Sequence, residues 1–316
     1  MGCSHRISHL STVVRPEEHL IGMLGRHHLL SGYRMYRKAL YQISSDVTKQ
    51  YPCAIDRPLY WDIYNQFGCG ETYIDFLKEH TIFGVYEPFL SNEVVINGQK
   101  MLQPYLINKH RYANEWRFCT SCVQEDVENE AMPFFRLEHQ LPTLSVCYKH
   151  SKRLHLFCSF CHTRDRLIDR IGYPSGLLCR YCNEELTETT SFIDDDVIWL
   201  HQTMIRLMNG QVSLPSLEQL KRTYQNQLGL CEYGNGFSVK QRGITKAAQK
   251  ELDNYFDPRL YSALFTNCDK EGSAKRTPSL YLYRVLFKDD VVFSPVVHLL
   301  IIRMLFGDIN NIPQMN

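Results

Sequence analysis

The feature that most constrains this chain is a set of cysteines in closely spaced pairs. The segment "CTSCVQEDVENEAMPFFRLEHQLPTLSVCYKH", residues 119–150, opens with Cys-x-x-Cys and closes with Cys-x-x-His, and two more Cys-x-x-Cys pairs follow. Each pair offers two ligands, so two pairs complete one tetrahedral zinc site. The sequence therefore predicts two Zn²⁺ ions per chain. The predicted ligands are Cys119, Cys122, Cys147 and His150 for the first ion and Cys158, Cys161, Cys179 and Cys182 for the second.

Cysteine usage also indicates the compartment. The chain has twelve cysteines and opens with "MGCSHRISHLST", which lacks the apolar segment of a secretion signal. In such a chain, paired cysteines favour metal thiolates over disulfides, and we expect a cytoplasmic protein. The cysteines without ligand spacing are interpreted as small buried hydrophobes. They are Cys3, Cys53, Cys69, Cys231 and Cys268.

The remaining sequence has helical periodicity. Pro16 suits the first position of a helix, Glu17 and Glu18 suit its N-terminal end, and Gly32 suits its stop. A second helix is expected from about 33 to 43, and "PLYWDIYNQFG" and "ETYIDFLKEH" predict two more. The segment "TIFGVYEPFL" lacks a clean period and is expected to be packed but irregular.

Helical spacing returns after residue 194. Helices are predicted in "DDVIWLHQTMIRLMNG", "SLEQLKRTYQNQLGL", "ITKAAQKELDNYF", "LYLYRVLF" and "VVHLLIIRMLF". The last is shorter than the ~18 residues of a spanning helix, so we expect a buried helix and no membrane partner. The predicted fold is mainly α, with an N-terminal helical domain (1–115), two tandem zinc-finger or zinc-ribbon modules (116–190) and a C-terminal helical bundle (191–316).

Charge alone does not indicate a partner, because the formal net charge is only +1. Cations nevertheless gather around the cysteine pairs, where they could contact DNA phosphates or simply be solvated. The candidate DNA-binding residues are Arg136, Lys149, Lys152, Arg153, Arg164, Arg166, Arg170 and Arg180.

Catalysis is not expected. Four protein ligands close each metal site, whereas a catalytic zinc keeps one position open. Glu125 and Asp126 could serve as acid and base, or could lie in the first turn of a helix after Cys122. His139 could be an extra ligand, or could find a partner inside the module. A zinc-dependent nuclease or hydrolase is the alternative, but neither a nucleotide-binding loop nor a His-Glu-x-x-His motif occurs. No small-molecule substrate is predicted.

The segment "RFCTSCVQEDVENEAMPFFRLEHQLPTLSVCYKHSKRL" resembles the zinc module of the TniQ/TnsD transposon target-selection proteins. "PEEHLIGMLGRHHLLSGYR" is similar to the N-terminal helix of that family, and "LKEHTIFGVYEPFL" resembles a segment of its TnsD branch. The later stretches "IWLHQTM", "YQNQLGL" and "SPVVHLLIIRMLFG" are similar to the TnsD continuation, so the resemblance covers nearly the whole chain. Thr120 and Ala131–Met132 depart from the usual proline and glycine, without touching a predicted ligand.

The resemblance implies a non-enzymatic bacterial adaptor that binds a double-stranded DNA attachment site. It also implies recruitment of a TnsC-like AAA+ ATPase, and thereby of transposase subunits. Nucleoid association would follow from DNA binding. The alternative is a TniQ subunit that docks on an RNA-guided CRISPR effector complex and reads little DNA itself. TnsD proteins usually carry further DNA-reading helices, so the resemblance does not establish sequence-specific reading by this stretch.

The N-terminal helices are the expected contact for the ATPase. The resemblance places that contact here, and the cations of this region exceed what a core needs. They could also simply solvate a helical face. The candidate partner-binding residues are Arg15, Arg26, Arg34, Arg37 and Lys38.

Overall fold

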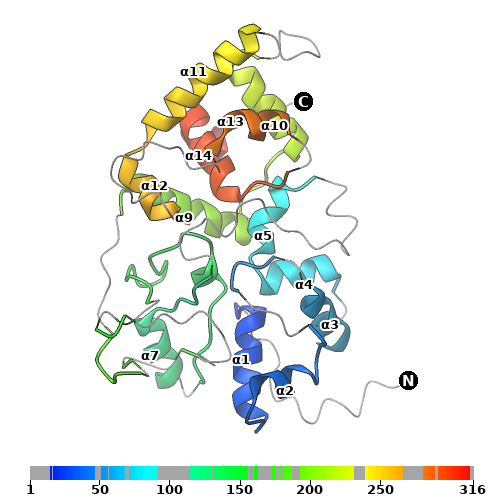
Figure 1. Ribbon diagram of the computed structural model, residues 1–316, viewed down its shortest axis with the longest axis vertical. Coiled ribbons are helices and arrows are strands. Elements are labelled where there is room, and N and C mark those ends of the chain that lie inside the picture. The colour runs from blue at the N-terminus through cyan, green and yellow to red at the C-terminus, as the bar shows by residue number, and fades with distance from the viewer. Residues whose placement is uncertain are drawn as a thin grey trace. The chain divides into compact units, whose positions relative to one another are not determined.

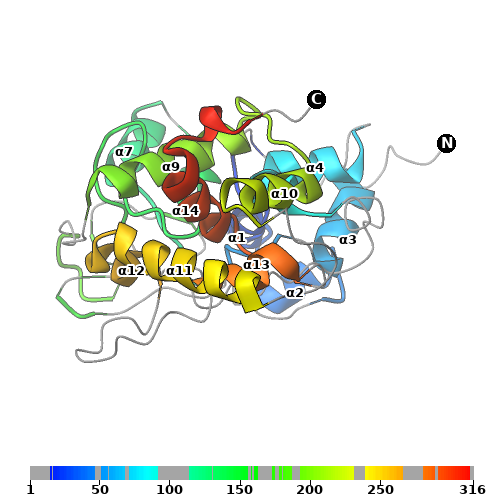
Figure 2. The same cartoon turned by 90° about the horizontal axis from the view of Figure 1, so that it is seen from above.

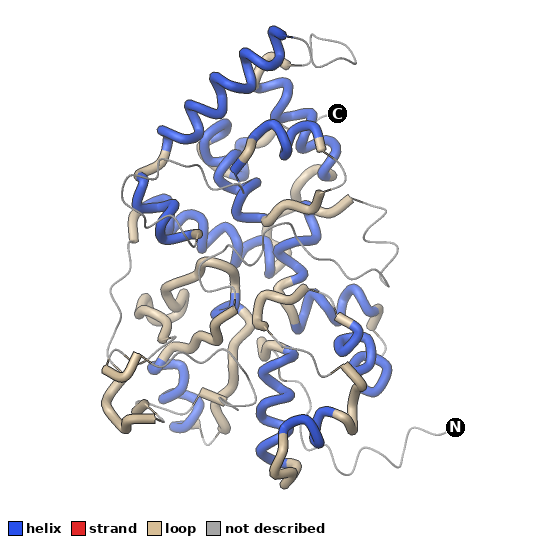
Figure 3. The backbone as a smooth tube through the Cα atoms, viewed as in Figure 1, coloured by secondary structure: helices blue, strands red, loops and turns tan. Residues whose placement is uncertain are grey.

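The computed structural model confirms a mainly α fold. It describes residues 15, 17–46, 51–55, 57–67, 71–91, 114–129, 131–155, 158, 160–162, 173–174, 178–179, 181–186, 193–230, 239–265, 280–288 and 291–313. Every regular element within these ranges is a helix (Figure 3), and the only β-type pairings are isolated bridges such as Phe118 with His155.

The chain divides into two compact units (Figure 1). Unit 1 comprises Met1–Phe83 and Tyr112–Ser191, and unit 2 comprises Gly84–Arg111 and Phe192–Asn316. Unit 1 therefore holds both the N-terminal helices and the cysteine pairs. The division into domains 1–115, 116–190 and 191–316 stays a prediction.

Unit 1 begins with α1 (Leu20–Leu30), which starts later than expected. The Nδ1 atom of His19 accepts a hydrogen bond from the Ile21 amide and caps the helix, so the predicted start at Pro16 is wrong. Glu18 lies before the helix and pairs with Arg26 instead of lying in the first turn. Gly32, at φ 72°, follows the last turn and confirms the predicted glycine stop.

The other N-terminal helices agree in part with the sequence patterns. α2 (Tyr36–Leu40) is shorter than the predicted helix, whereas α3 (Pro58–Phe67) and α4 (Tyr73–His80) occur where expected. The segment expected to be irregular instead forms α5 (Phe83–Tyr86) and the 3₁₀ turn η2 (Glu87–Phe89), and most of its side chains are buried. In the cysteine-rich part lie α7 (Thr120–Glu128) and the turn η4 (Glu138–Gln140).

Unit 2 is a bundle around an apolar C-terminal helix. It includes η2 and all of α5 except Phe83. Its other elements are α9 (Asp195–Met208), α10 (Leu217–Gln227), α11 (Val239–Tyr255), α12 (Pro258–Leu264), α13 (Leu282–Phe287), α14 (Pro295–Phe306) and η6 (Ile309–Asn311). All the predicted helices occur, and α12 is an additional one. α14 lies between α9 and α11 and contacts both (Figure 2). Residues 295–302 of α14 are all buried, as expected. Among the described helices, none combines the length and apolarity that crossing a bilayer requires.

Candidate metal centres

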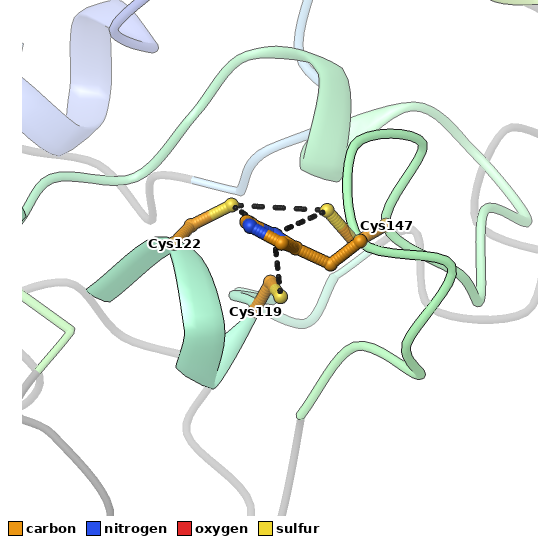
Figure 4. A group of neighbouring side chains, drawn as sticks. Cys119, Cys122 and Cys147 are labelled. Atoms are coloured by element: carbon orange, nitrogen blue, oxygen red, sulfur yellow. Dashed lines mark hydrogen bonds between the residues drawn. The ribbon is translucent and has the colours of Figure 1, made fainter. Parts of the chain in front are cut away.

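The first predicted ligand quartet comes together in unit 1. The Nδ1 atom of His150 lies 3.6, 3.3 and 3.6 Å from the Sγ atoms of Cys119, Cys122 and Cys147, respectively. The Sγ atoms of Cys122 and Cys147 are 3.7 Å apart, and all three cysteines are buried. Figure 4 shows the three cysteine side chains directed toward one centre.

These separations fit a tetrahedral zinc. Zn–S bonds of about 2.3 Å and Zn–N bonds of about 2.0–2.1 Å at tetrahedral angles place sulfur atoms about 3.8 Å apart and sulfur and nitrogen about 3.5 Å apart. A disulfide requires an S–S distance of about 2.0 Å, so the 3.7 Å between Cys122 and Cys147 excludes one there. The donor set of three thiols and one imidazole is typical of a closed structural site.

The second quartet has the same arrangement with four sulfurs. The Sγ atoms of Cys158 and Cys182 are 3.6 Å apart, and those of Cys161 and Cys179 are 3.7 Å apart. The four Sγ atoms lie within 4.8 Å of one another. The amide of Phe160 also donates to the Cys158 sulfur at 3.4 Å, a contact that stabilises a thiolate. Both predicted quartets are thus in place to hold a metal ion.

Three of the four ligand pairs are built on the same backbone turn. In each, the residue after the second ligand has a left-handed φ of 54–62°, and its amide donates to the carbonyl of the first ligand. These hydrogen bonds run from the amides of Ser151, His162 and Asn183 to the carbonyls of Cys147, Cys158 and Cys179, at N···O distances of 2.8, 2.9 and 2.8 Å, respectively. This reversal directs both side chains of a pair to one side. No glycine marks these turns, so the sequence alone did not reveal them.

The pair Cys119–Cys122 is positioned differently. Cys119 is the N-cap residue of α7, and Cys122 lies in the first turn of that helix. The positive end of a helix dipole favours thiolates there. Hydrogen bonds from the thiols of Cys122 and Cys147 hold the pKa of Cys119 well below its usual range. The first centre therefore joins a helix N-terminus to a tight turn, and the second joins two tight turns.

Glu125 supports the first centre from outside the ligand set. It lies on α7, and its Oε1 is 3.0 Å from Nε2 of His150, the ring nitrogen opposite the one that faces the sulfurs. Its Oε2 accepts a hydrogen bond from Lys149 Nζ at 2.6 Å. The hydrogen bonds of Lys149 and then His150 lower the pKa of Glu125. An ionised carboxylate here fixes the imidazole tautomer that presents Nδ1 to a metal.

Glu125→Gln should therefore weaken metal binding at the first centre about 10- to 100-fold, the usual effect of losing such a partner. The measurement is zinc transfer to a chromophoric chelator, with the four-sulfur centre as a reference in the same molecule. Glu128→Gln is the matched control, because Glu128 lies on the same helix and bonds Gln124. Lys149→Gln removes the ion pair between Lys149 and Glu125 but keeps the Glu125 carboxylate, so it shows how much of the effect on zinc binding comes from that ion pair. Equal zinc transfer from E125Q and E128Q would contradict the assignment.

Asp126 and Arg136 form a second pair next to the centre. Arg136 donates from Nη1 and Nη2 to the two carboxylate oxygens at 3.0 and 2.7 Å, and its guanidinium lies 4.5 Å from the Phe134 ring centroid. The Arg136 side chain is 12% exposed. Glu125 and Asp126 thus belong to separate pairs on α7, and Arg136 is mainly engaged inside unit 1.

The other candidate DNA-binding residues lie near the ligands. Lys149 is exposed and pairs with Glu125, Lys152 is exposed and donates to Ser121 Oγ at 2.8 Å, and Arg153 is half-buried. Arg164, Arg166, Arg170 and Arg180 lie outside the described residues.

His139 is fully buried in the first module. Burial lowers its pKa to about 3, so the ring is neutral at physiological pH. A ligand atom of His139 lies within 4.8 Å of ligand atoms of Glu138 and Cys147, which makes an alternative ligand group that shares Cys147. The Cys₃His quartet already completes a tetrahedral set without it.

The candidate partner-binding cations separate into two groups. Arg15 donates to the Met132 carbonyl, and Arg26 is buried against Glu18, so both are engaged within unit 1. Arg34, Arg37 and Lys38 are exposed.

Comparison with protein-family models gives a match for the N-terminal half of the chain. No curated protein matches the chain. Residues 13–154, from before α1 through the first ligand quartet, match the TniQ family model, so this part of the chain is similar to TniQ proteins.

Proposed function

We propose that this protein is a target-selection adaptor of DNA transposition of the TnsD branch. It binds double-stranded target DNA and recruits a TnsC-like AAA+ ATPase, which brings the transposase subunits. The TniQ match over residues 13–154 carries this proposal, because it includes both the N-terminal helices and the first ligand quartet. The two centres bind zinc as closed structural sites, which hold a surface in shape and leave no position for catalytic water. Such an adaptor works in the bacterial cytoplasm, on the nucleoid.

The recruitment surface lies at the end of α1 and around α2. Five large apolar side chains between residues 29 and 41 are 41–56% exposed. They are Leu29, Leu30, Tyr33, Met35 and Tyr41. Arg34, Arg37 and Lys38 lie among them in the sequence and are also exposed. Exposed aromatic and aliphatic side chains flanked by cations are typical of a protein interface, with the apolar groups as anchors and the cations steering association.

The DNA surface lies on the metal modules. It includes Lys149, Lys152 and Arg153 and, by sequence position, the four arginines between residues 164 and 180. Arg136 is better described as a structural residue because Asp126 holds it. Duplex binding by the chain alone separates this proposal from docking on an RNA-guided complex. A subunit that reaches DNA only through a guide RNA does not need to bind the duplex itself.

Substitution of the apolar anchors tests recruitment. Met35→Ser together with Tyr41→Ser should weaken capture of the TnsC-like ATPase of the same transposon by at least tenfold, because anchor residues typically contribute more than 1 kcal/mol each. The measurement is the equilibrium affinity for the ATPase, with zinc content and the unfolding midpoint unchanged.

Val127→Ser is the matched control for that experiment. Val127 is 60% exposed, but it lies on α7 and outside the recruitment surface. Deletion of residues 1–60 would be a less specific test of recruitment than these point changes. It would remove core residues such as Leu20 and Ile21 and so disturb unit 1. Wild-type affinity in the M35S/Y41S protein would place recruitment elsewhere.

A further inference from the structure

The first three turns of α11 carry a concentrated positive charge. Residues 239–250, "VKQRGITKAAQK", contain Lys240, Arg242, Lys246 and Lys250 and no acid. All four cations are exposed. This helix lies in unit 2, outside the TniQ match and outside the residues predicted to bind DNA.

Helical spacing places three of these cations in one row. The buried residues of α11 are Gln241, Thr245, Ala248, Gln249 and Leu252. They form the face that packs in unit 2, where α11 contacts α13 and α14 (Figure 2). Arg242, Lys246 and Lys250 are four residues apart, so they follow one another about 6 Å apart along the axis on a different side.

Small residues keep the space beside this row open. Gly243 and Ala247 each follow a cation and are exposed. A Cβ atom placed on Gly243 would meet nothing within 4 Å. The backbone of an extended partner could therefore approach the helix closely along the three cations.

The row is unfavourable for the isolated helix. Arg242–Lys246 and Lys246–Lys250 are like-charge pairs at i,i+4, each of which disfavours the helix by about 0.2–0.5 kcal/mol. Lys246 and Lys250 form no ion pair within the described ranges. By contrast, Arg222 on α10 pairs with Glu218 at 2.6 Å. The charges of Lys246 and Lys250, which extend the row from Arg242, can thus be neutralised by an anionic partner.

We propose that the row Arg242–Lys246–Lys250 binds the phosphate backbone of double-stranded DNA, as a second contact apart from the metal modules. A protein partner would require apolar anchors, but the large exposed hydrophobics of α11 are Val239 and Tyr255, at its two ends. Phosphates require only regularly spaced cations with open access. The inference rests on the proposed function in taking DNA as the partner, and it adds a surface in unit 2.

The test is the salt dependence of duplex binding by the full chain. Labelled duplexes of unrelated sequences are titrated with the R242Q/K246Q/K250Q protein at several salt concentrations. Each lost phosphate contact reduces the slope of log K against log salt by about 0.9, so three contacts should reduce it by about 2.7. Affinity should fall equally on all sequences, because backbone contacts carry no base information.

Two matched triple variants make the result specific. R34Q/R37Q/K38Q removes the same charge from the recruitment surface and should leave the slope unchanged. K149Q/K152Q/R153Q tests the metal-module surface separately. Glutamine has nearly the helix propensity of lysine and arginine, and like-charge pairs are removed, so the α11 variant should keep its helix content by circular dichroism.

The outcomes separate this inference from the proposed function. The α11 contact alone is overturned if the α11 variant keeps the wild-type slope. It is also overturned if the R34Q/R37Q/K38Q control shows the same reduction in slope as the α11 variant. If the slope falls in the α11 variant but not in the metal-module variant, the result supports the α11 contact and overturns the assignment of DNA binding to the modules. No duplex binding by the wild-type chain overturns both DNA contacts, while recruitment of the ATPase remains separately measurable.

Discussion

Removal of zinc should unfold the cysteine-rich part of unit 1. Each quartet gathers four ligands within 4.8 Å, and without an ion the thiolates among them would repel one another at that distance. Structural zinc sites contribute apparent binding energies of about 10–16 kcal/mol in small modules, and that energy is folding energy. We therefore expect about two zinc ions per chain by elemental analysis. Strong chelation should remove the hydrogen-exchange protection of residues 117–155, and added zinc should restore it.

A cysteine outside the quartets supplies the control. Cys122→Ser should lose one zinc and most of that protection. Cys53→Ser should keep both ions, because Cys53 is a buried thiol whose pKa is raised to about 12 by burial. Protein purified without chelator that contains no zinc, or a C122S chain that still holds two ions, would contradict the metal assignment.

The ligand quartets were predictable because metal coordination restricts spacing so strongly. Two ligands on one turn must be about three residues apart, and such pairs are recognisable without any structure. The support around the quartets was not predictable in this way. Glu125 and Asp126 are adjacent carboxylates in the sequence, yet one bonds His150 and the other bonds Arg136. Only the path of the chain between residues 126 and 150 decides which cation each carboxylate meets.

Helix positions were likewise more predictable than the roles of charged residues. Helical periodicity located α3, α4, α9 and α10, because apolar spacing follows from which face is buried. The predicted start of α1 was wrong because His19 caps that helix, and histidine is not among the residues that typically mark a helix N-cap. Composition also could not tell that Arg26 is buried while Arg37 is exposed, since both lie in the same basic segment.

The ion pair of Arg26 with Glu18 makes the second large prediction. Both side chains are buried, and Arg26 donates to the carboxylate from both Nε and Nη2. Arg26→Ala leaves the Glu18 carboxylate buried without its counter-charge. Breaking a buried pair in this way costs about 3–5 kcal/mol, a large fraction of the ~5–15 kcal/mol that stabilises a typical domain. Urea denaturation of the zinc-loaded chain should show this loss in the free energy of unfolding.

Two further variants separate this structural role from a role in recruitment. Arg37→Ala, on the exposed side of the same basic segment, should change the free energy of unfolding by less than about 0.5 kcal/mol. Glu18→Gln combined with Arg26→Met removes both charges together and should recover much of the stability, because no unpaired charge remains buried. If R26A unfolds like the wild type but no longer binds the ATPase, Arg26 belongs to the recruitment surface after all. If R26A is destabilised and the double variant binds the ATPase normally, Arg26 acts by holding the start of α1 in place for the exposed residues that follow it.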